Sequence, residues 1–323
     1  MERAIVAVTR KIPEAGLALL QAKFEVRLNK KDGVLTGSEL KKLVKGADGV
    51  LALLTDRIDD SLLAASGKQL KIVANYAVGF DNIDLAAAKK RKVIVTNTPG
   101  VLTEAVAEHA ITLLMSVARR IVESDKFTRA GRYEGWEPEL LLGPELAGKT
   151  LGILGLGRIG SRVAELAALG LRMKIIYYDN GNRNRELEQK LGAQAVSMRK
   201  VITASDAISI HVPLLPATRH LIGKSELGSM KPGAIVINTS RGPVVDEKAL
   251  AAALKNKVIW GAGLDVFEFE PKISPELLKL DNVVMTPHTA SATIEARDAM
   301  ATLAAKNIIA VLEGRPPLTP VKI

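Results

Sequence analysis

The sequence predicts an α/β protein that contains two doubly wound parallel-sheet domains. Short apolar segments alternate with amphipathic helical segments from residue 4 to residue 97. The same alternation begins again near residue 150 and continues to residue 288. Short connections between such segments are typical of parallel strands whose crossover helices cover both faces of a sheet. The two series therefore indicate two sheets.

The first series contains four expected strands and four expected helices. The strands are residues 4–9, 49–54, 71–76 and 93–97, and the helices are residues 13–24, 38–46, 59–66 and 84–91. The strands are nearly continuous runs of Val, Ile, Leu and Ala, which indicates burial on both faces. This part of the chain has no glycine fingerprint for a nucleotide, so we expect it to bind a different ligand.

A helical pattern follows the Thr-Pro-Gly break at residues 98–100. Residues 101–131 keep apolar side chains on one face, which predicts one long helix that crosses between the domains. Residues 132–149 are irregular and contain several Gly and Pro. The second series then has six expected strands, at residues 150–157, 174–179, 207–212, 234–240, 260–266 and 282–288.

The last helical pattern, residues 290–314, is not followed by a strand. A helix without its own strand can return to pack on the first sheet. We therefore expect a discontinuous first domain, residues 1–99 and 290–323, and a second domain, residues 100–289.

Composition narrows the class of function. The net charge is +10, but the charges are dispersed and only 3% of the residues are aromatic, which favours a solvated basic surface over a nucleic-acid site. No apolar run reaches the roughly 18 residues of a membrane span. The chain has no Cys, which excludes disulfides and thiolate chemistry. Because the N-terminus has no export signal pattern, we expect a cytoplasmic protein.

A nucleotide-binding motif opens the second series. Residues 151–160, LGILGLGRIG, fit G-x-G-x-x-G with Gly155, Gly157 and Gly160, between an apolar strand and a helix. Gly155 permits the tight turn, Gly157 lets a pyrophosphate approach the backbone, and Gly160 lets helix and strand pack closely. The motif predicts a Rossmann domain that binds a dinucleotide.

Asp179 lies 19 residues after Gly160, at the end of the next expected strand. An acid there binds the adenosine ribose hydroxyls and repels a 2′-phosphate, which favours NAD(H). Arg183 and Arg185 follow closely, and either could reach a 2′-phosphate. NADP(H) therefore stays open as the alternative.

Three ionisable residues follow three different strands. Arg241 follows residues 234–240, Glu270 follows residues 260–266, and His288 ends the last strand. Ligands of open α/β sheets bind beyond the carboxyl ends of the strands. A carboxylate beside His288 favours the protonated imidazole, which then serves as a general acid. Arg241 is suited to hold a substrate carboxylate with two hydrogen bonds. The spacing alone leaves open whether these side chains meet.

The other three histidines have less informative contexts. His109 lies within the long helical pattern, where packing or capping is the expected role. His211 ends a strand and either lines the cofactor cleft or is structural. His220 is expected at the surface or in packing. No cluster of metal-ligating residues is apparent, so we expect no metal.

Several motifs together resemble the D-isomer-specific 2-hydroxyacid dehydrogenases over essentially the whole chain. They are residues 74–110, LGPELAGKTLGILGLGRIG, HVPLLPATRHLI, MKPGAIVINTSRGPVVDEKAL, GLDVFEFEP and TPHTASAT. NYAVGFDNID, PGVLTEA and GWEPELLLG are most similar to the glyoxylate/hydroxypyruvate reductase branch. The resemblance implies NAD(P)H-dependent reduction of glyoxylate to glycolate or of hydroxypyruvate to D-glycerate.

The resemblance also implies roles for individual residues. Arg241, Glu270 and His288 would be catalytic, and Val78 and Gly79 would bind the substrate carboxylate through backbone amides. The residues expected to bind the cofactor are Thr103, Gly155, Gly157, Arg158, Ile159, Gly160, Asp179, Pro213, Thr239, Ser240 and Asp265.

Family architecture is implied in the same way. A flavodoxin-like substrate domain and a Rossmann domain would enclose a cleft. Relatives are commonly homodimers, and Trp136 lies where relatives place an aromatic residue at the subunit interface, near a neighbouring active site. Simple interface packing is the alternative role for Trp136.

Other members of the same superfamily remain as alternatives. A 2-ketogluconate reductase or a 3-phosphoglycerate dehydrogenase would share these motifs, and so would a cofactor-sensing corepressor of the C-terminal-binding type. An intact set of Arg241, Glu270 and His288 favours catalysis over sensing. Val78 replaces the lysine of the phosphite dehydrogenases, which makes phosphite an unsuitable substrate.

Overall fold

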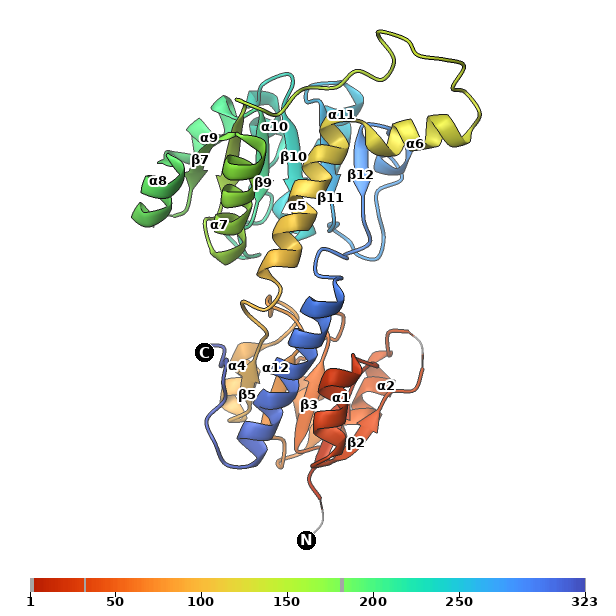
Figure 1. Ribbon diagram of the computed structural model, residues 1–323. Coiled ribbons are helices and arrows are strands. Elements are labelled where there is room, and N and C mark those ends of the chain that lie inside the picture. Colours follow the sequence, from red (N-terminus) through yellow and green to blue (C-terminus); the bar gives the residue numbers. More distant parts are fainter. Residues whose placement is uncertain (1–2, 32, 181–182, 323) are drawn as a thin grey trace. The chain divides into compact units, whose positions relative to one another are not determined.

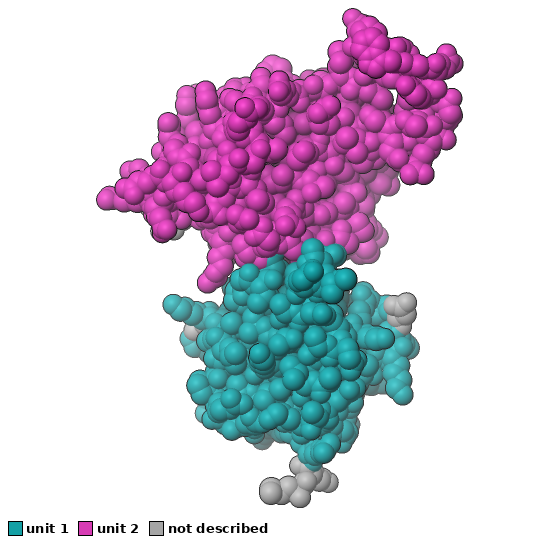
Figure 2. All heavy atoms as spheres, viewed as in Figure 1, with its two compact units in different colours: residues 1–102, 292–323 teal, residues 103–291 magenta. Residues whose placement is uncertain are grey.

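The computed structural model describes residues 3–31, 33–180 and 183–322. It divides into two compact units (Figure 2). Unit 1 contains residues 1–102 and 292–323, and unit 2 contains residues 103–291. No helix in the described part of the chain is long and apolar enough to cross a membrane.

Unit 1 is built on a five-stranded parallel sheet (Figure 1). In sheet order the strands are β2 (Glu25–Leu28), β1 (Ile5–Val8), β3 (Gly49–Ala52), β4 (Ile72–Asn75) and β5 (Ile94–Thr96). The helices are α1 (Glu14–Gln21), α2 (Gly37–Val44), α3 (Asp60–Ser66), α4 (Leu85–Lys90) and α12 (Ile294–Leu312). The sequence-based prediction omitted β2, an edge strand whose sequence EVRL has no buried residue.

The C-terminal helix α12 packs against α1 within unit 1. A Cβ atom on Gly16 of α1 would lie only 2.4 Å from the backbone oxygen of Ala301 in α12, so this close approach requires glycine. The helix begins at Ile294 rather than at residue 290, because the Thr293 side chain caps it by accepting the N–H of Ala296.

Unit 2 contains a seven-stranded parallel sheet. In sheet order the strands are β12 (Val283–Met285), β11 (Gly261–Leu264), β10 (Ile235–Asn238), β9 (Ala207–Ile210), β6 (Thr150–Leu154), β7 (Lys174–Tyr178) and β8 (Gln194–Ala195). The helices are α5 (Thr103–Ala118), α6 (Ile121–Arg129), α7 (Arg158–Glu165), α8 (Arg185–Leu191), α9 (Met198–Ala204), α10 (Lys224–Ser229) and α11 (Glu247–Lys255). The predicted α/β class with two parallel sheets is therefore confirmed.

The strand order of unit 2 reverses between β6 and β9. From β6 the chain first adds β7 and β8 on one side, and then β9 to β12 on the other. Such a reversal leaves a crevice beyond the carboxyl ends of the two central strands, because their crossover helices lie on opposite faces. This crevice is the expected ligand-binding edge of the sheet.

The single long helix predicted for residues 101–131 is wrong, since Figure 1 shows two helices, α5 and α6. Between them Arg120 has a left-handed backbone conformation (φ 50°). Its guanidinium donates to both carboxylate oxygens of Glu123, at 2.7 and 2.8 Å, and to the backbone oxygen of Leu142. The two local bonds to Glu123 and the tertiary bond to Leu142 stabilise the break between the helices, which the helical periodicity of the segment does not reveal.

Candidate active site

The three candidate catalytic residues all follow neighbouring strands of unit 2. Arg241 follows β10, Glu270 follows β11 and His288 follows β12. These strands are adjacent and parallel, so their carboxyl ends lie at one edge of the sheet. The structure brings Glu270 and His288 together, with 2.9 Å between Glu270 Oε2 and His288 Nδ1. Arg241 Nη1 donates to the backbone oxygen of Ser240 at 2.9 Å.

Glu270 is held in place by its own loop. Its Oε1 atom accepts the N–H of Phe267 at 3.0 Å, which leaves Oε2 for His288. Glu247, a buried residue at the start of α11, stabilises the loop that carries Glu270. The Glu247 carboxylate accepts the N–H groups of Glu268 at 2.8 Å and of Ser274 at 2.7 Å. Sequence analysis did not identify Glu247, because an acid in the first turn of a helix is common and carries no sign of a distant partner.

His288 has a left-handed backbone conformation, with φ of 56°. This conformation is costly for a residue with a side chain and persists only where the surroundings fix it. Here Asp265 does so, because its backbone oxygen accepts the His288 N–H at 2.9 Å. Its carboxylate accepts the next two N–H groups, of Thr289 at 2.7 Å and of Ala290 at 2.8 Å.

Asp265 is fully buried and still favours the ionised form. Burial by itself raises the pKa of this carboxyl group. Hydrogen bonds from His109, Thr286, Thr289 and Ala290 more than offset burial and hold the pKa below its ordinary value. The structure thus places Asp265 beneath the His288 turn.

The glycine motif has the geometry of a dinucleotide cradle. Gly155 has φ of 91°, and a Cβ atom there would lie 2.9 Å from the backbone of His211, which follows β9. A Cβ atom on Gly160 would lie 2.1 Å from the backbone oxygen of Gly155. Among the described residues, and apart from the chain neighbours of Gly157, no heavy atom lies within 4 Å of a Cβ atom built on Gly157, so space is open at the N-terminus of α7. Backbone N–H groups at such a helix start bind phosphate groups.

Asp179 directly follows β7 and lies next to this cradle. Its Oδ2 atom accepts the N–H of Leu156 at 2.7 Å, so the acid is fixed against the glycine turn. Arg183, one of the two residues that could favour NADP(H), forms an ion pair with Glu188 instead, at 2.6 Å. Arg185 begins α8.

The other expected cofactor residues lie at the carboxyl ends of strands or at helix starts in unit 2. Thr239 follows β10, and its buried Oγ1 atom has no hydrogen-bond partner among the described residues. A buried hydroxyl without a partner is suited to accept or donate a bond to a bound ligand. Ser240 donates to the backbone oxygen of Val212. The remaining members are half-buried or exposed: Thr103, Arg158, Ile159 and Pro213.

Val78 and Gly79 belong to unit 1, in the loop after β4. Asn97 Nδ2 donates to the Val78 oxygen at 2.8 Å, and Asn75 Nδ2 donates to the Gly79 oxygen at 2.8 Å. In a trans peptide the N–H points opposite to the C=O. Fixing these two oxygens therefore also fixes the direction of the N–H groups that follow them.

The remaining histidines differ from one another. His109 Nε2 lies 2.9 Å from Thr286 Oγ1, so this helix residue has a specific polar partner and does not merely pack. His211 Nε2 lies 2.8 Å from Ser209 Oγ, and burial lowers the pKa of His211 to about 4. His220 is exposed and contacts Glu268 at 2.7 Å. In residues 3–31, 33–180 and 183–322, no group of three or more potential protein ligands could hold a metal ion.

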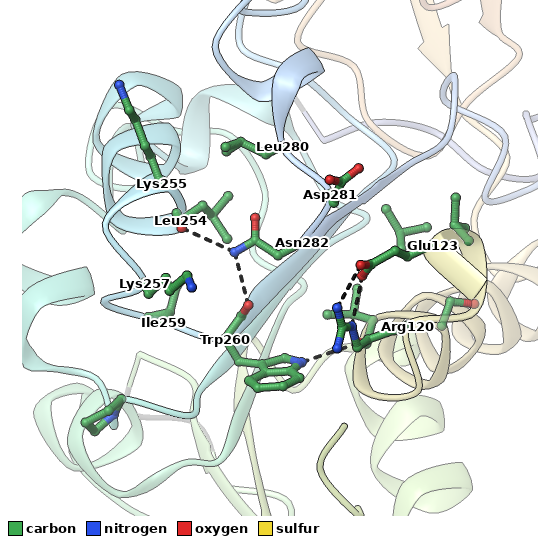
Figure 3. Close-up of a pocket in the computed structure, with 15 residues that line it drawn as sticks. Arg120, Glu123, Leu254, Lys255, Lys257, Ile259, Trp260, Leu280, Asp281 and Asn282 are labelled. Atoms are coloured by element: carbon green, nitrogen blue, oxygen red, sulfur yellow. Dashed lines mark hydrogen bonds and ion pairs between the residues drawn. The ribbon is translucent and has the colours of Figure 1, made fainter. Parts of the chain in front are cut away.

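A cavity of about 590 Å³ lies elsewhere in unit 2 (Figure 3). Pro232, Trp260 and Asn282 line it, and they precede β10, β11 and β12 respectively. It therefore lies at the amino ends of the strands that carry the candidate catalytic residues at their carboxyl ends. Asn282 Nδ2 donates to the backbone oxygens of Leu254 and Trp260, both at 3.2 Å, which ties the wall of this cavity together.

Comparison with known proteins supports one family. Residues 111–290 match the family model for the NAD-binding domain of D-isomer specific 2-hydroxyacid dehydrogenases. The chain is 51% identical over 316 residues to a glyoxylate reductase of Thermococcus litoralis, covering 97% of this chain and 95% of that protein. It is 50% identical to a glyoxylate reductase of Korarchaeum cryptofilum, covering 97% and 94%.

Comparison with solved structures supports the same family. The TT0316 protein of Thermus thermophilus superposes with a TM-score of 0.92 at 42% identity, covering 98% of this chain and all of that one. An NADPH-dependent glyoxylate/hydroxypyruvate reductase of Sinorhizobium meliloti, in complex with NADP and malonate, has a TM-score of 0.85 at 35% identity, covering 99% and 97%. The glycine cradle, the reversal of strand order and these matches together identify the chain as a member of the D-isomer specific 2-hydroxyacid dehydrogenases, an oxidoreductase family that uses a nicotinamide cofactor.

Proposed function

We propose that this enzyme reduces glyoxylate to glycolate, and hydroxypyruvate to D-glycerate, with His288 as the proton donor. The observation that carries the proposal is the 2.9 Å contact between His288 and Glu270 at the cofactor edge of the sheet. The relatives that share about half of the sequence over its length are glyoxylate reductases, which supports this choice of substrate.

The contact between His288 and Glu270 supports His288 as the source of the proton. A carboxylate only accepts hydrogen bonds, so the Nδ1 atom of His288 must carry a hydrogen toward Glu270. The Nε2 atom is then the position that releases a proton to the substrate oxygen and later regains one. A nicotinamide cofactor held at the glycine cradle of Gly155, Gly157 and Gly160 would supply the hydride for the carbonyl carbon when bound. Hydride and proton together convert the carbonyl to a hydroxyl group.

Arg241 and the Val78–Gly79 loop are proposed to hold the substrate. The guanidinium offers two parallel donors, which match a carboxylate of a 2-oxo acid and place the adjacent carbonyl. The N–H groups of Val78 and Gly79 in unit 1 are proposed to bind a substrate carboxylate. Their directions are fixed because the preceding carbonyl oxygens, of Ala77 and Val78, accept hydrogen bonds from the Thr98 N–H and from Asn97 Nδ2.

We further propose that NAD(H) is preferred to NADP(H). Asp179 stands fixed beside the glycine turn, where its charge opposes a 2′-phosphate. Arg183 is engaged by Glu188, which reduces its availability for that phosphate. Because the Sinorhizobium meliloti relative is NADPH-dependent, the preference must be measured for this chain.

A homodimer is proposed on the basis of exposed apolar side chains after α5. Trp136 is 83% exposed, and Tyr133, Leu142 and Ile121 are each more than half exposed. Large aromatic side chains of this kind are characteristic of interface cores. Light scattering of wild type and Trp136→Ala at matched concentrations tests this proposal. A wild-type mass of a single 34.5 kDa chain would refute it.

Initial rates of cofactor oxidation test the enzymatic proposal. Wild type is assayed with glyoxylate and hydroxypyruvate, each with NADH and NADPH. His288→Ala should lower kcat at least about 100-fold, the usual contribution of a general acid, with cofactor binding retained. Arg241→Lys should raise KM for the oxo acid, since it loses the second parallel donor. Wild type that oxidises neither cofactor with either acid, or His288→Ala that retains its turnover, would refute the proposal.

A further inference from the structure

A short chain of hydrogen bonds connects helix α5 to the turn that carries His288. We propose that His109 is a positioning residue for His288, acting through Thr286 and Asp265. This inference rests on the proposed role of His288 as the proton donor. Its members are buried or half-buried and come from three segments of unit 2: α5, the end of β11 and the end of β12.

The chemistry of the three side chains fixes the direction of the chain. Asp265 only accepts, so the single hydroxyl hydrogen of Thr286 points to Asp265 Oδ1, at 2.6 Å. The Thr286 oxygen must then accept from its other neighbour, His109 Nε2, at 2.9 Å. His109 therefore carries a hydrogen on Nε2. The same nitrogen lies 3.5 Å from Asp265 Oδ1.

Asp265, which these bonds hold in place, in turn fixes the backbone position of His288. Its two carboxylate oxygens and its backbone oxygen accept three consecutive N–H groups, of His288, Thr289 and Ala290. They surround the strained left-handed backbone of His288. A fully buried carboxylate accepts these hydrogen bonds only while it is ionised and all of its donors are in place.

Backbone hydrogen bonds already join Asp265 to β10 and Thr286 to β11. The donors that Thr286, Thr289 and Ala290 offer to the Asp265 carboxylate belong to the segment that carries His288, whereas His109 belongs to α5, which packs on β10 and β11. His109 therefore adds a side-chain anchor for the Thr286 hydroxyl and the Asp265 carboxylate from outside that segment. An error of 1 Å in the position of a reacting group can reduce a rate by about 100-fold. This is how a residue that touches neither substrate nor cofactor can govern the reaction.

Two substitutions separate the hydrogen bond from the packing. His109→Gln places an amide N–H donor near the position of Nε2, whereas His109→Leu has similar bulk and no donor. Steady-state rates should show kcat lowered about 10- to 100-fold in His109→Leu and within about threefold of wild type in His109→Gln. Cofactor affinity, measured by fluorescence titration, should change less than threefold in both. Thermal unfolding of both variants controls for loss of the fold.

A double-mutant cycle with His288→Ala provides the decisive comparison. When His288 is absent, its position no longer matters, so His109→Leu should change the residual rate less than twofold. An equal loss in both backgrounds would overturn the proposal, because His109 would then act through general stability or cofactor binding.

A readout without turnover separates this inference from the proposed function. The chain has only four histidines, so their ring resonances can be assigned by single substitutions in the histidine-labelled protein. His109→Leu should shift the His288 ring signals and leave those of His220 in place, and His109→Gln should leave both in place. Unchanged His288 signals in His109→Leu would overturn the inference even if the enzyme reduces glyoxylate. A shifted His288 signal in a protein without reductase activity would refute only the proposed function.

Discussion

His288 and Glu270 are 18 residues apart in the chain, and their side chains meet at 2.9 Å between Nδ1 and Oε2. Glu270 offers only one oxygen to His288, because the N–H of Phe267 holds the other. Both side chains are partly exposed, at 27% and 31%, which allows exchange of protons with solvent. This pair leads to the first prediction.

Glu270→Gln should lower kcat about 10- to 100-fold. The amide oxygen still accepts the Nδ1 hydrogen, so the ring keeps its orientation, but the negative charge beside the ring is lost. Initial rates of Glu270→Gln check this, with wild type and Glu268→Gln, a neighbouring carboxylate, as the controls. An unchanged kcat would show that the charge of Glu270 is not needed.

Alanine substitutions at Gly160 and Gly157 should affect different properties, the stability of the fold and the affinity for the cofactor respectively. Gly160→Ala places a Cβ atom 2.1 Å from the backbone oxygen of Gly155, so it should destabilise the fold by about 1–3 kcal/mol or more. Gly157→Ala meets no heavy atom within 4 Å and should unfold like wild type, yet weaken cofactor binding at least about 10-fold. Urea unfolding and cofactor titration check the pair. Tight cofactor binding by Gly157→Ala would mean that the pyrophosphate lies elsewhere.

Asp179→Asn should shift the cofactor preference toward NADPH. The amide oxygen can still accept the Leu156 N–H, so the glycine turn is retained, while the charge that opposes a 2′-phosphate is removed. We expect the ratio of kcat/KM for NADH to that for NADPH to fall about 10-fold, which corresponds to about 1.4 kcal/mol. The double variant Asp179→Asn/Arg183→Ala tests the arginine. If Arg183 leaves its ion pair with Glu188 to bind the 2′-phosphate, the double variant should lose part of the increased preference for NADPH. An unchanged ratio in Asp179→Asn would exclude Asp179 as the selector.

His211 should make the fold sensitive to mild acid. Burial lowers its pKa from 6.5 to about 4, so between these pH values the unfolded chain binds a proton that the native state does not. Stability contributed by the neutral ring is complete above about pH 6.5 and is lost as the pH falls toward 4, by at most about 1.4 kcal/mol per pH unit. His211→Gln should flatten this slope in urea unfolding measured at pH 4.5 to 7. An equally steep loss in the variant would assign the sensitivity to other groups.

Buried strands and the apolar edge strands β5 and β12 were predictable from local pattern, whereas the polar edge strands were not. Strands such as β9 and β10 are apolar because neighbours cover both faces, so their sequences show them directly. The two omitted strands, β2 and β8, lie at sheet edges, and β8 has only two residues. These edge strands carry polar side chains and few apolar ones, which removes the pattern on which a sequence-based prediction relies.

Within the candidate site, the proposed reacting groups were easier to recognise in the sequence than the residues that hold them in place. Glycine spacing and the placement of Arg241 and His288 at strand ends are visible in the sequence. The residues that hold the site, such as Glu247, Thr286 and His109, act through hydrogen bonds between distant segments. Nothing in the local sequence of a threonine or an N-terminal helix glutamate specifies such a partner. These contacts depend on tertiary geometry.

The discontinuity of unit 1 has a consequence for biosynthesis. Helix α12 leaves the ribosome after every other described helix, yet it packs against α1, which lies near the start of unit 1. Every strand of the unit 2 sheet is already synthesised by then. The apolar face of unit 1 that α12 covers therefore stays uncovered while the whole of unit 2 is being made. A nascent chain that stalls before Ile294 would expose that face to chaperones and proteases.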